Sequence, residues 1–161
     1  MSHAMLARIP WLTKDGCLDM RKVPLESNYR ALVGPDRKAN LSSLRVLASA
    51  VAHDRTEAGL FLMGFLVSLP EDDWEMRQAA VESLRHLRTR GCANLLLSEL
   101  QRVKSSNASR RYLDTILSVL QYFPKELVHE KLSGLAEDKS FSPRMRLKFE
   151  RCLDGEFRQS F

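Results

Sequence analysis

The sequence predicts an all-α protein built from stacked pairs of helices, and three observations support this fold class. Glycine (7) and proline (6) are sparse among the 161 residues, which favours helices over a sheet protein with many turns. From residue 41 onward, apolar residues recur at spacings of three and four, as on one face of a helix. The pattern also repeats with a period in the middle thirties, which is typical of an α-solenoid.

The chain divides into three parts. Residues 1–5 are expected to come from an expression vector, with Met5 as the native start. Residues 6–40 are predicted to form an irregular N-terminal arm, either two short extended pieces around an Asp-Gly turn or a loosely ordered segment, followed by a short helix near residues 25–32. Residues 41–155 are predicted to form the helical repeat domain.

Seven main helices are predicted in the repeat domain from their start and stop signals. Asp54 and Asn107 stand where they can cap the second and fifth helices, and Ser142 precedes a first-turn proline in the seventh. Acidic residues 71–73 suit the positive end of the third helix, which Gly91 is expected to end. The predicted helices cover residues 41–52, 55–68, 72–88, 92–103, 108–123, 124–135 and 143–154.

The second predicted helix has an unusual composition. Residues 58–69 are apolar with almost no interruption, but the run is too short to cross a bilayer. A helix without a polar face has to be covered on several sides. We therefore expect the N-terminal arm to lie partly over it.

The helix pairs repeat along the chain. An offset of 36 places Met76, Ala80 and Leu84 on Tyr112, Ile116 and Leu120. A further offset of 33 leads from these to Met145, Phe149 and Leu153. Because such pairs cannot bury their apolar stripes alone, stacking builds the core, and Leu84, Leu120 and Leu153 are predicted to be equivalent buried positions.

Residues 75–84, Glu-Met-Arg-Gln-Ala-Ala-Val-Glu-Ser-Leu, resemble the first helix of a HEAT or HEAT-like repeat, in which an apolar–Arg pair precedes small residues and a leucine. Met145-Arg146 is a weaker match, and Leu113 stands where the middle unit would carry arginine. The resemblance covers about residues 41–153. It implies a right-handed α-α superhelix with a concave, partner-binding face, and it implies no particular partner.

No catalytic motif is found. His129-Glu130 begins like a zinc-protease helix, but the second histidine is absent, so an exposed polar pair is expected. No glycine-rich phosphate loop occurs, and residues 71–73 are interpreted as capping acids. The sequence therefore predicts a protein that is not an enzyme, with no cofactor and no metal; an enzyme of the HEAT-like glycosylase or bilin-lyase kind is a disfavoured alternative.

The three cysteines, Cys17, Cys92 and Cys152, lie far apart and form no CxxC motif. An odd, scattered set predicts reduced thiols in a cytoplasmic protein rather than a disulfide framework. Buried structural thiols are the favoured interpretation, over reactive or metal-binding ones.

A basic set is the one constellation that suggests a ligand. The net charge is +5, and Arg110, Arg111, Arg144, Arg146 and Lys148 begin the fifth helix or lie along the seventh. Arg111 and Arg144 are repeat-equivalent at the offset of 33, so stacking is expected to bring them close. These cations either grip phosphates or form a solvated face paired with nearby acids. We favour the second interpretation, and with it an adaptor that binds another protein; a nucleic-acid-binding module is the alternative.

Overall fold

The computed structural model describes residues 8–159, so the expected vector residues 1–5 lie outside the described part. Within this part the chain is all-helical, with eight helices and one isolated antiparallel bridge between Leu12 and Leu18. The predicted all-α class is therefore confirmed. The helices are α2 (Glu26–Leu32), α3 (Arg37–Ala52), α4 (Thr56–Ser68), α5 (Trp74–Ser83), α6 (Arg90–Arg102), α7 (Arg110–Leu120), α8 (Lys125–Glu137) and α9 (Pro143–Leu153).

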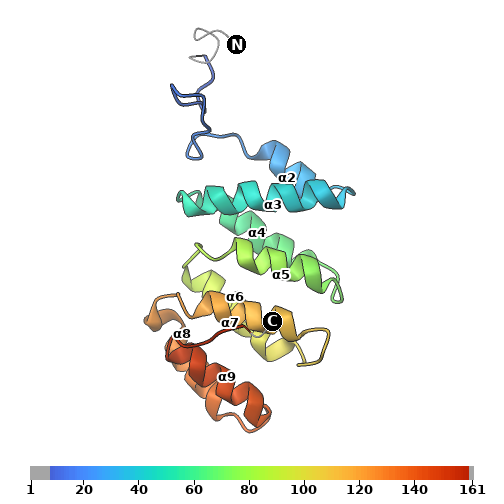
Figure 1. Ribbon diagram of the computed structural model, residues 1–161, viewed down its shortest axis with the longest axis vertical. Coiled ribbons are helices and arrows are strands. Elements are labelled where there is room, and N and C mark those ends of the chain that lie inside the picture. The colour runs from blue at the N-terminus through green and yellow to red at the C-terminus, as the bar shows by residue number, and fades with distance from the viewer. Residues whose placement is uncertain (1–7, 160–161) are drawn as a thin grey trace.

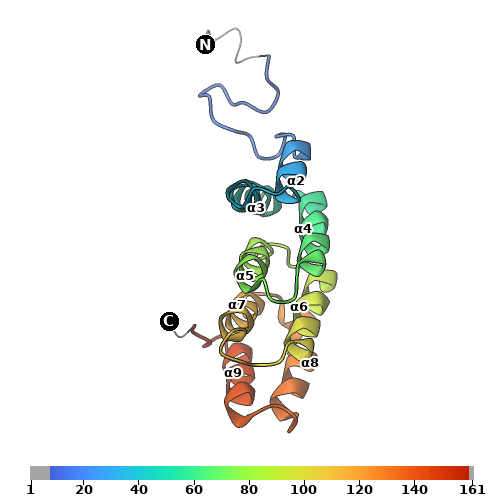
Figure 2. The ribbon, with the colours of Figure 1, turned by 90° about the vertical axis from the view of Figure 1, so that its right-hand side faces the viewer.

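The helices form two layers that follow the long axis of the molecule (Figure 1). Figure 2 shows α3, α5, α7 and α9 in one layer and α2, α4, α6 and α8 in the other. Across the layers α2 packs on α3, α3 on α4, α4 on α5, α6 on α7 and α8 on α9. Within a layer α3 packs on α5, α5 on α7, α7 on α9 and α6 on α8. This arrangement buries one face of each pair against the next pair.

Helices α7 and α9 run parallel, as their contacts show. Asp114 contacts Lys148, the Leu117 carbonyl accepts a hydrogen bond from Cys152, and Gln121 bonds to the backbone of Phe157. Each successive contact lies further along both segments in the same direction. The first turns of α7 and α9 therefore lie at the same end of their layer.

The apolar core runs through the whole stack and contains most of the predicted repeat positions. Leu84 and Leu120 are completely buried, as predicted. Leu153 is only half-buried, and its neighbour Cys152 occupies the buried position instead. The prediction for Leu153 is therefore wrong by one residue: Cys152 faces α7, where its thiol donates to the Leu117 carbonyl, and Leu153 lines a small cavity instead.

Several predicted helix starts are wrong because other residues make the capping hydrogen bonds. Helix α3 begins at Arg37 rather than at 41, since the Asp36 carboxylate accepts from the backbone amides of Lys38 and Ala39. Asp54 does not cap α4; it adopts a left-handed backbone conformation, with φ of 67°, one residue before Arg55 at the N-cap.

The third and fifth predicted helices are also shorter than expected. Thr89 caps α6 by accepting from the amide of Cys92, so Gly91 lies inside α6 and does not end α5. Helix α7 starts after Ser109, whose hydroxyl lies in a local hydrogen-bonded turn with Ser106, and Asn107 does not act as its cap. The Ser142 cap and the first-turn proline of α9 are confirmed.

The N-terminal arm packs against the start of α4, as predicted. The Arg55 guanidinium donates from Nη1 to the backbone carbonyls of Met20 and Val23, at 3.2 and 3.0 Å. Tyr29 of α2 stacks on Phe61 of α4 with ring centroids 4.2 Å apart. These contacts cover one side of α4 only.

A buried polar network joins α5, α6 and α7. The Glu99 carboxylate accepts from the Tyr112 hydroxyl at 2.6 Å and from Arg102 at 2.8 and 2.9 Å. The guanidinium of Arg77, buried beside it, donates to Glu99 and to the carbonyls of Leu69 and Pro70. Every member is paired, so the network fixes the two layers against each other without leaving a lone buried charge.

Candidate interaction surface

The predicted basic residues lie at one end of the α7–α9 layer. Arg110 and Arg111 begin α7, Arg144 is in the first turn of α9, and all three are exposed. Among residues 8–159, none of the three forms an ion pair within 4.0 Å. The structure therefore brings these arginines to neighbouring first turns, without the acidic partners that a neutralised face would supply.

Lys148 and Arg146 are less exposed than the three arginines of the first turns. The Lys148 amine donates to the Asp114 carboxylate at 2.7 Å, and both side chains are largely buried. Arg146 is half-buried, and its Nε atom is buried without a hydrogen-bond partner. Lys148 is thus engaged inside the fold, and the exposed basic group reduces to Arg110, Arg111 and Arg144.

A second surface lies on α4, where apolar residues face solvent. Leu60 is 63% exposed and Val67 is 67% exposed. Gly64 lies between them, is exposed, and has open space where a side chain would stand. Since residues at i, i+4 and i+7 share one side of a helix, Leu60, Gly64 and Val67 form a single stripe, here called the α4 face.

The α4 face is extended toward α6 by Met63. This side chain is half-buried, and its terminal methyl would lie 3.8 Å from a Cβ added at Gly91 in the first turn of α6. Exposed apolar residues scattered singly are normal in proteins, whereas a contiguous apolar stripe often marks an interaction site. The stripe and its extension make the α4 face the strongest candidate for binding.

The matching surface of α8 is polar, although α4 and α8 belong to the same layer (Figure 2). The exposed positions of α8 include Glu126, Glu130, Lys131 and Glu137. Between these two helices of one layer, large apolar side chains are therefore exposed on α4 and not among the described residues of α8.

Sequence reasoning identified the apolar run of α4, and we expected such a helix to be covered on several sides. The arm, α3 and α5 do pack against it, but we did not predict that one face stays exposed. Among residues 8–159, the elements around α4 leave Leu60 and Val67 mostly exposed. The signal that could have revealed it is the position of Leu60, Gly64 and Val67, three apolar residues opposite the buried stripe of Ala58, Leu62 and Phe65.

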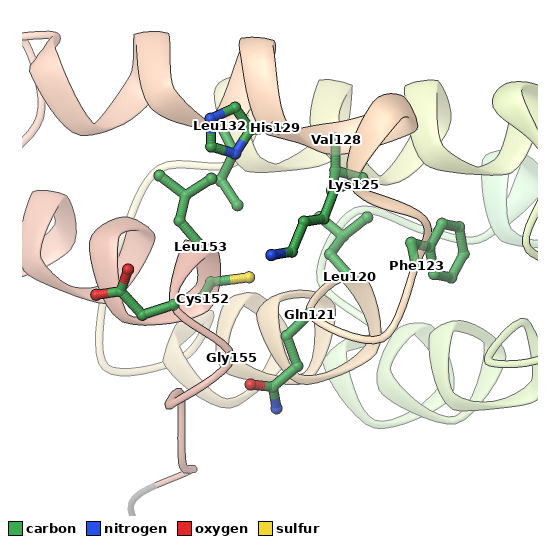
Figure 3. Close-up of a pocket in the computed structure, with 11 residues that line it drawn as sticks. Leu120, Gln121, Phe123, Lys125, Val128, His129, Leu132, Cys152, Leu153 and Gly155 are labelled. Atoms are coloured by element: carbon green, nitrogen blue, oxygen red, sulfur yellow. The ribbon is translucent and has the colours of Figure 1, made fainter.

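A small cavity of about 100 Å³ lies between α7, α8 and α9. Figure 3 shows the Cys152 sulfur and the Lys125 amine, which come from different helices, among its apolar lining residues. The Cys152 thiol donates to the Leu117 carbonyl at 3.3 Å, and burial raises the pKa of this thiol to about 12. A thiol held in the protonated form is a poor nucleophile and a poor metal ligand.

The remaining residues considered for chemistry are His129, Glu130, the other two cysteines and the acids at 71–73. His129 and Glu130 are both exposed on α8, as expected for a polar surface pair. Burial raises the pKa of the Cys92 thiol to about 12, whereas Cys17 is exposed, so the prediction of a buried thiol is wrong for Cys17. Asp73 caps α5 through the amide of Met76, which confirms the capping role within residues 71–73. Across residues 8–159 no three or more His, Cys, Asp or Glu residues are grouped as metal ligands would be.

No helix among the described residues is long and apolar enough to cross a membrane. No protein family, curated protein or solved structure matches the chain.

Proposed function

We propose that the chain is a HEAT-like helical-repeat adaptor, not an enzyme, and that its α4 face binds another protein. The two-layer stack of helix pairs and the offset of 36 between the buried positions of α5 and α7 support the repeat assignment. The free thiols of the described cysteines are consistent with a cytoplasmic location. The observation that carries the proposal is the exposure of Leu60 and Val67 on either side of Gly64.

The stability of the isolated chain does not explain why exposed apolar residues and a glycine stand on the α4 face. Large apolar side chains each contribute about 1.5–3 kcal/mol when fully buried, and Leu60 and Val67 are mostly exposed. Glycine in a helix interior lowers the stability of the helix. No atom lies within 4 Å of a Cβ added at position 64, so packing inside the chain does not require a glycine there. A partner packed on the stripe would bury both side chains.

A pair of matched glycines allows a direct test. Gly64 on α4 and Gly134 on α8 are both exposed, and an added Cβ meets nothing within 4 Å at either position. A photo-crosslinking amino acid at either position should therefore leave the fold intact. In cells of the native host, we expect position 64 to give one discrete crosslinked protein and position 134 to give none.

Equal crosslinking from the two positions, or none from position 64, would contradict the proposal. Circular dichroism of both crosslinker variants serves as the control for folding. Mass spectrometry of the adduct then identifies the partner and the peptide that contacts α4.

A nucleic-acid-binding module is the second candidate, and the unpaired Arg110, Arg111 and Arg144 are the observation that favours it. Arginines at the first turn of a helix lie at the positive end of its dipole, where cations are disfavoured. Three such cations could contact three phosphates of a duplex, which predicts a log–log salt slope of about −3.

We expect no detectable binding to duplex DNA near 150 mM salt, a typical physiological ionic strength. Tight, salt-sensitive binding that Arg111→Gln with Arg144→Gln abolishes would instead support the nucleic-acid function. The matched control is Arg85→Gln with Arg88→Gln, which removes two exposed arginines from the opposite end of the same layer.

A further inference from the structure

The last described residues of the chain form a tail that crosses the outer face of α7. Gly155 ends α9 with a φ of 70°, a conformation that glycine adopts readily, and turns the chain back. The Gln121 side chain donates to the Phe157 carbonyl at 3.1 Å, and the Gln159 side chain donates to the Thr115 hydroxyl at 2.9 Å. Figure 1 shows this tail crossing the stack at α7.

The tail is held as an extended peptide with one apolar anchor. Phe157 is 5% exposed, while its neighbours Glu156 and Arg158 are exposed. It also shields the outer side of α7, where Thr115 is almost completely buried. The outer face of the layer that contains α7 thus holds a short segment of the tail. In this segment the buried Phe157 stands between the exposed Glu156 and Arg158.

Helix α5 presents the equivalent positions without a tail on them. The offset of 36 that superposes the buried Met76, Ala80 and Leu84 on α7 also places Ala79 on Thr115 and Glu82 on Ser118. Ala79 is half-exposed and Glu82 is exposed. The surface that the tail covers on α7 is therefore open one repeat earlier.

A groove of about 270 Å³ lies at this open position, between α3 and α5. Leu44, Ala48 and Ala79 give it an apolar lining, and Arg45 and Glu82 provide one charge on each wall. Among the described residues neither charge forms an ion pair within 4.0 Å. An apolar floor between an unpaired cation and an unpaired anion complements the tail sequence Glu156-Phe157-Arg158.

Resting on the adaptor function proposed above, we propose that the α3–α5 groove binds an extended segment of another protein in which a large apolar residue stands between an acidic and a basic residue. The apolar side chain enters between Leu44 and Ala79. The acid of the segment pairs with Arg45 and its base pairs with Glu82. The chain's own tail is occupied on α7, so the groove remains available to a partner.

The test uses a fluorescent synthetic peptide with the sequence of residues 154–159, Asp-Gly-Glu-Phe-Arg-Gln, and the full chain. We expect saturable binding by fluorescence anisotropy, and a loss of about tenfold in affinity for Glu82→Arg, because attraction to the peptide's arginine becomes repulsion. Ala79→Arg, which fills the groove, should weaken binding at least as much. Glu130→Arg on α8 is the matched charge control and should leave the affinity unchanged.

A charge swap provides a second measurement. Arg45→Glu with Glu82→Arg should bind a peptide whose glutamate and arginine are exchanged in preference to the original peptide. No saturable binding, or binding that neither Glu82→Arg nor Ala79→Arg weakens, would overturn the proposal. A dimer of the chain that Glu82→Arg dissociates would also overturn it, since a second copy would then fill the groove. The titration uses no residue of α4, so its failure is distinguishable from a failure of the α4 crosslink.

Discussion

Helices α4 and α7 are both rich in apolar residues, yet the structure buries them to very different extents. On α7 eight of the eleven residues are buried, including the polar Asp114 and Thr115. On α4 five of thirteen are buried, and Leu60 and Val67 face solvent. The difference teaches that the neighbours of a helix, and not its composition, determine which residues are buried.

The neighbours of α7 explain its burial. Helices α5 and α9 flank it within its layer, and the tail crosses its outer side. The two polar residues that this burial includes are both paired: Asp114 accepts from Lys148, and Thr115 bonds to Gln159 and to the Arg111 carbonyl. Among residues 8–159, no comparable element covers Leu60 and Val67 on the α4 face.

The largest effect that this comparison predicts concerns the buried ion pair beside α7. Lys148→Met leaves the Asp114 carboxylate buried without its cation, and removing one partner of a buried pair costs about 3–5 kcal/mol. Urea denaturation followed by circular dichroism measures the change in the free energy of unfolding. A loss below about 1 kcal/mol, a value usual for exposed pairs, would show that solvent reaches Asp114.

The next prediction compares how alanine substitutions in the core and on the α4 face change the free energy of unfolding. Leu84→Ala and Leu120→Ala should each lower the free energy of unfolding by about 2–5 kcal/mol, because both leave a cavity. Leu60→Ala should change it by less than about 0.5 kcal/mol, as at ordinary surface sites. A large loss for Leu60→Ala would mean that α4 is covered in solution, and the contrast with α7 would fail.

The polar network predicts a dependence of stability on pH. Burial alone would raise the pKa of Glu99, but hydrogen bonds from Arg102 and Tyr112 outweigh it and lower the pKa. A lowered carboxyl pKa adds stability above its ordinary value of about 4.3, and this contribution disappears as the pH falls through the folded-state value. Thermal melts between about pH 6 and pH 3 should therefore show a falling Tm, and Glu99→Gln should flatten this decline.

The smallest predicted effect uses the two exposed helix glycines. Gly64→Ala and Gly134→Ala should each raise the free energy of unfolding by about 0.5–1 kcal/mol, since both glycines lie in helix interiors with open space at the Cβ position. A gain at 134 and a loss at 64, measured by the same denaturation, would reveal a steric role for Gly64 inside the isolated chain.

Much of the fold could be predicted from the sequence because helical periodicity is a local signal. The apolar spacing along α5 and α7, and the Ser142-Pro143 start of α9, were sufficient to predict these elements. Helix starts failed where two capping residues compete within a few positions, as at Asp36 for α3 and Thr89 for α6. Local sequence does not show which hydrogen bond forms.

The candidate surfaces were harder to predict because they depend on long-range packing. Nothing near Lys148 in the sequence indicates that Asp114, in another helix, pairs with it. The tail on α7 and the open groove between α3 and α5 likewise arise from the packing of segments that are far apart in the sequence. Periodicity identified α4 as apolar, but exposure of the α4 face depends on where its neighbours end.

Crosslinking from position 64 in a chain that also carries Leu60→Gln and Val67→Gln tests the central claim most directly. These substitutions remove the exposed apolar side chains and should leave the melting temperature of the isolated chain nearly unchanged. We expect the crosslinked partner to decrease by about tenfold or more relative to the chain with only the crosslinker, since about 1.4 kcal/mol of lost binding energy suffices for a tenfold change. An undiminished crosslink in the double variant would contradict a binding role for the α4 face.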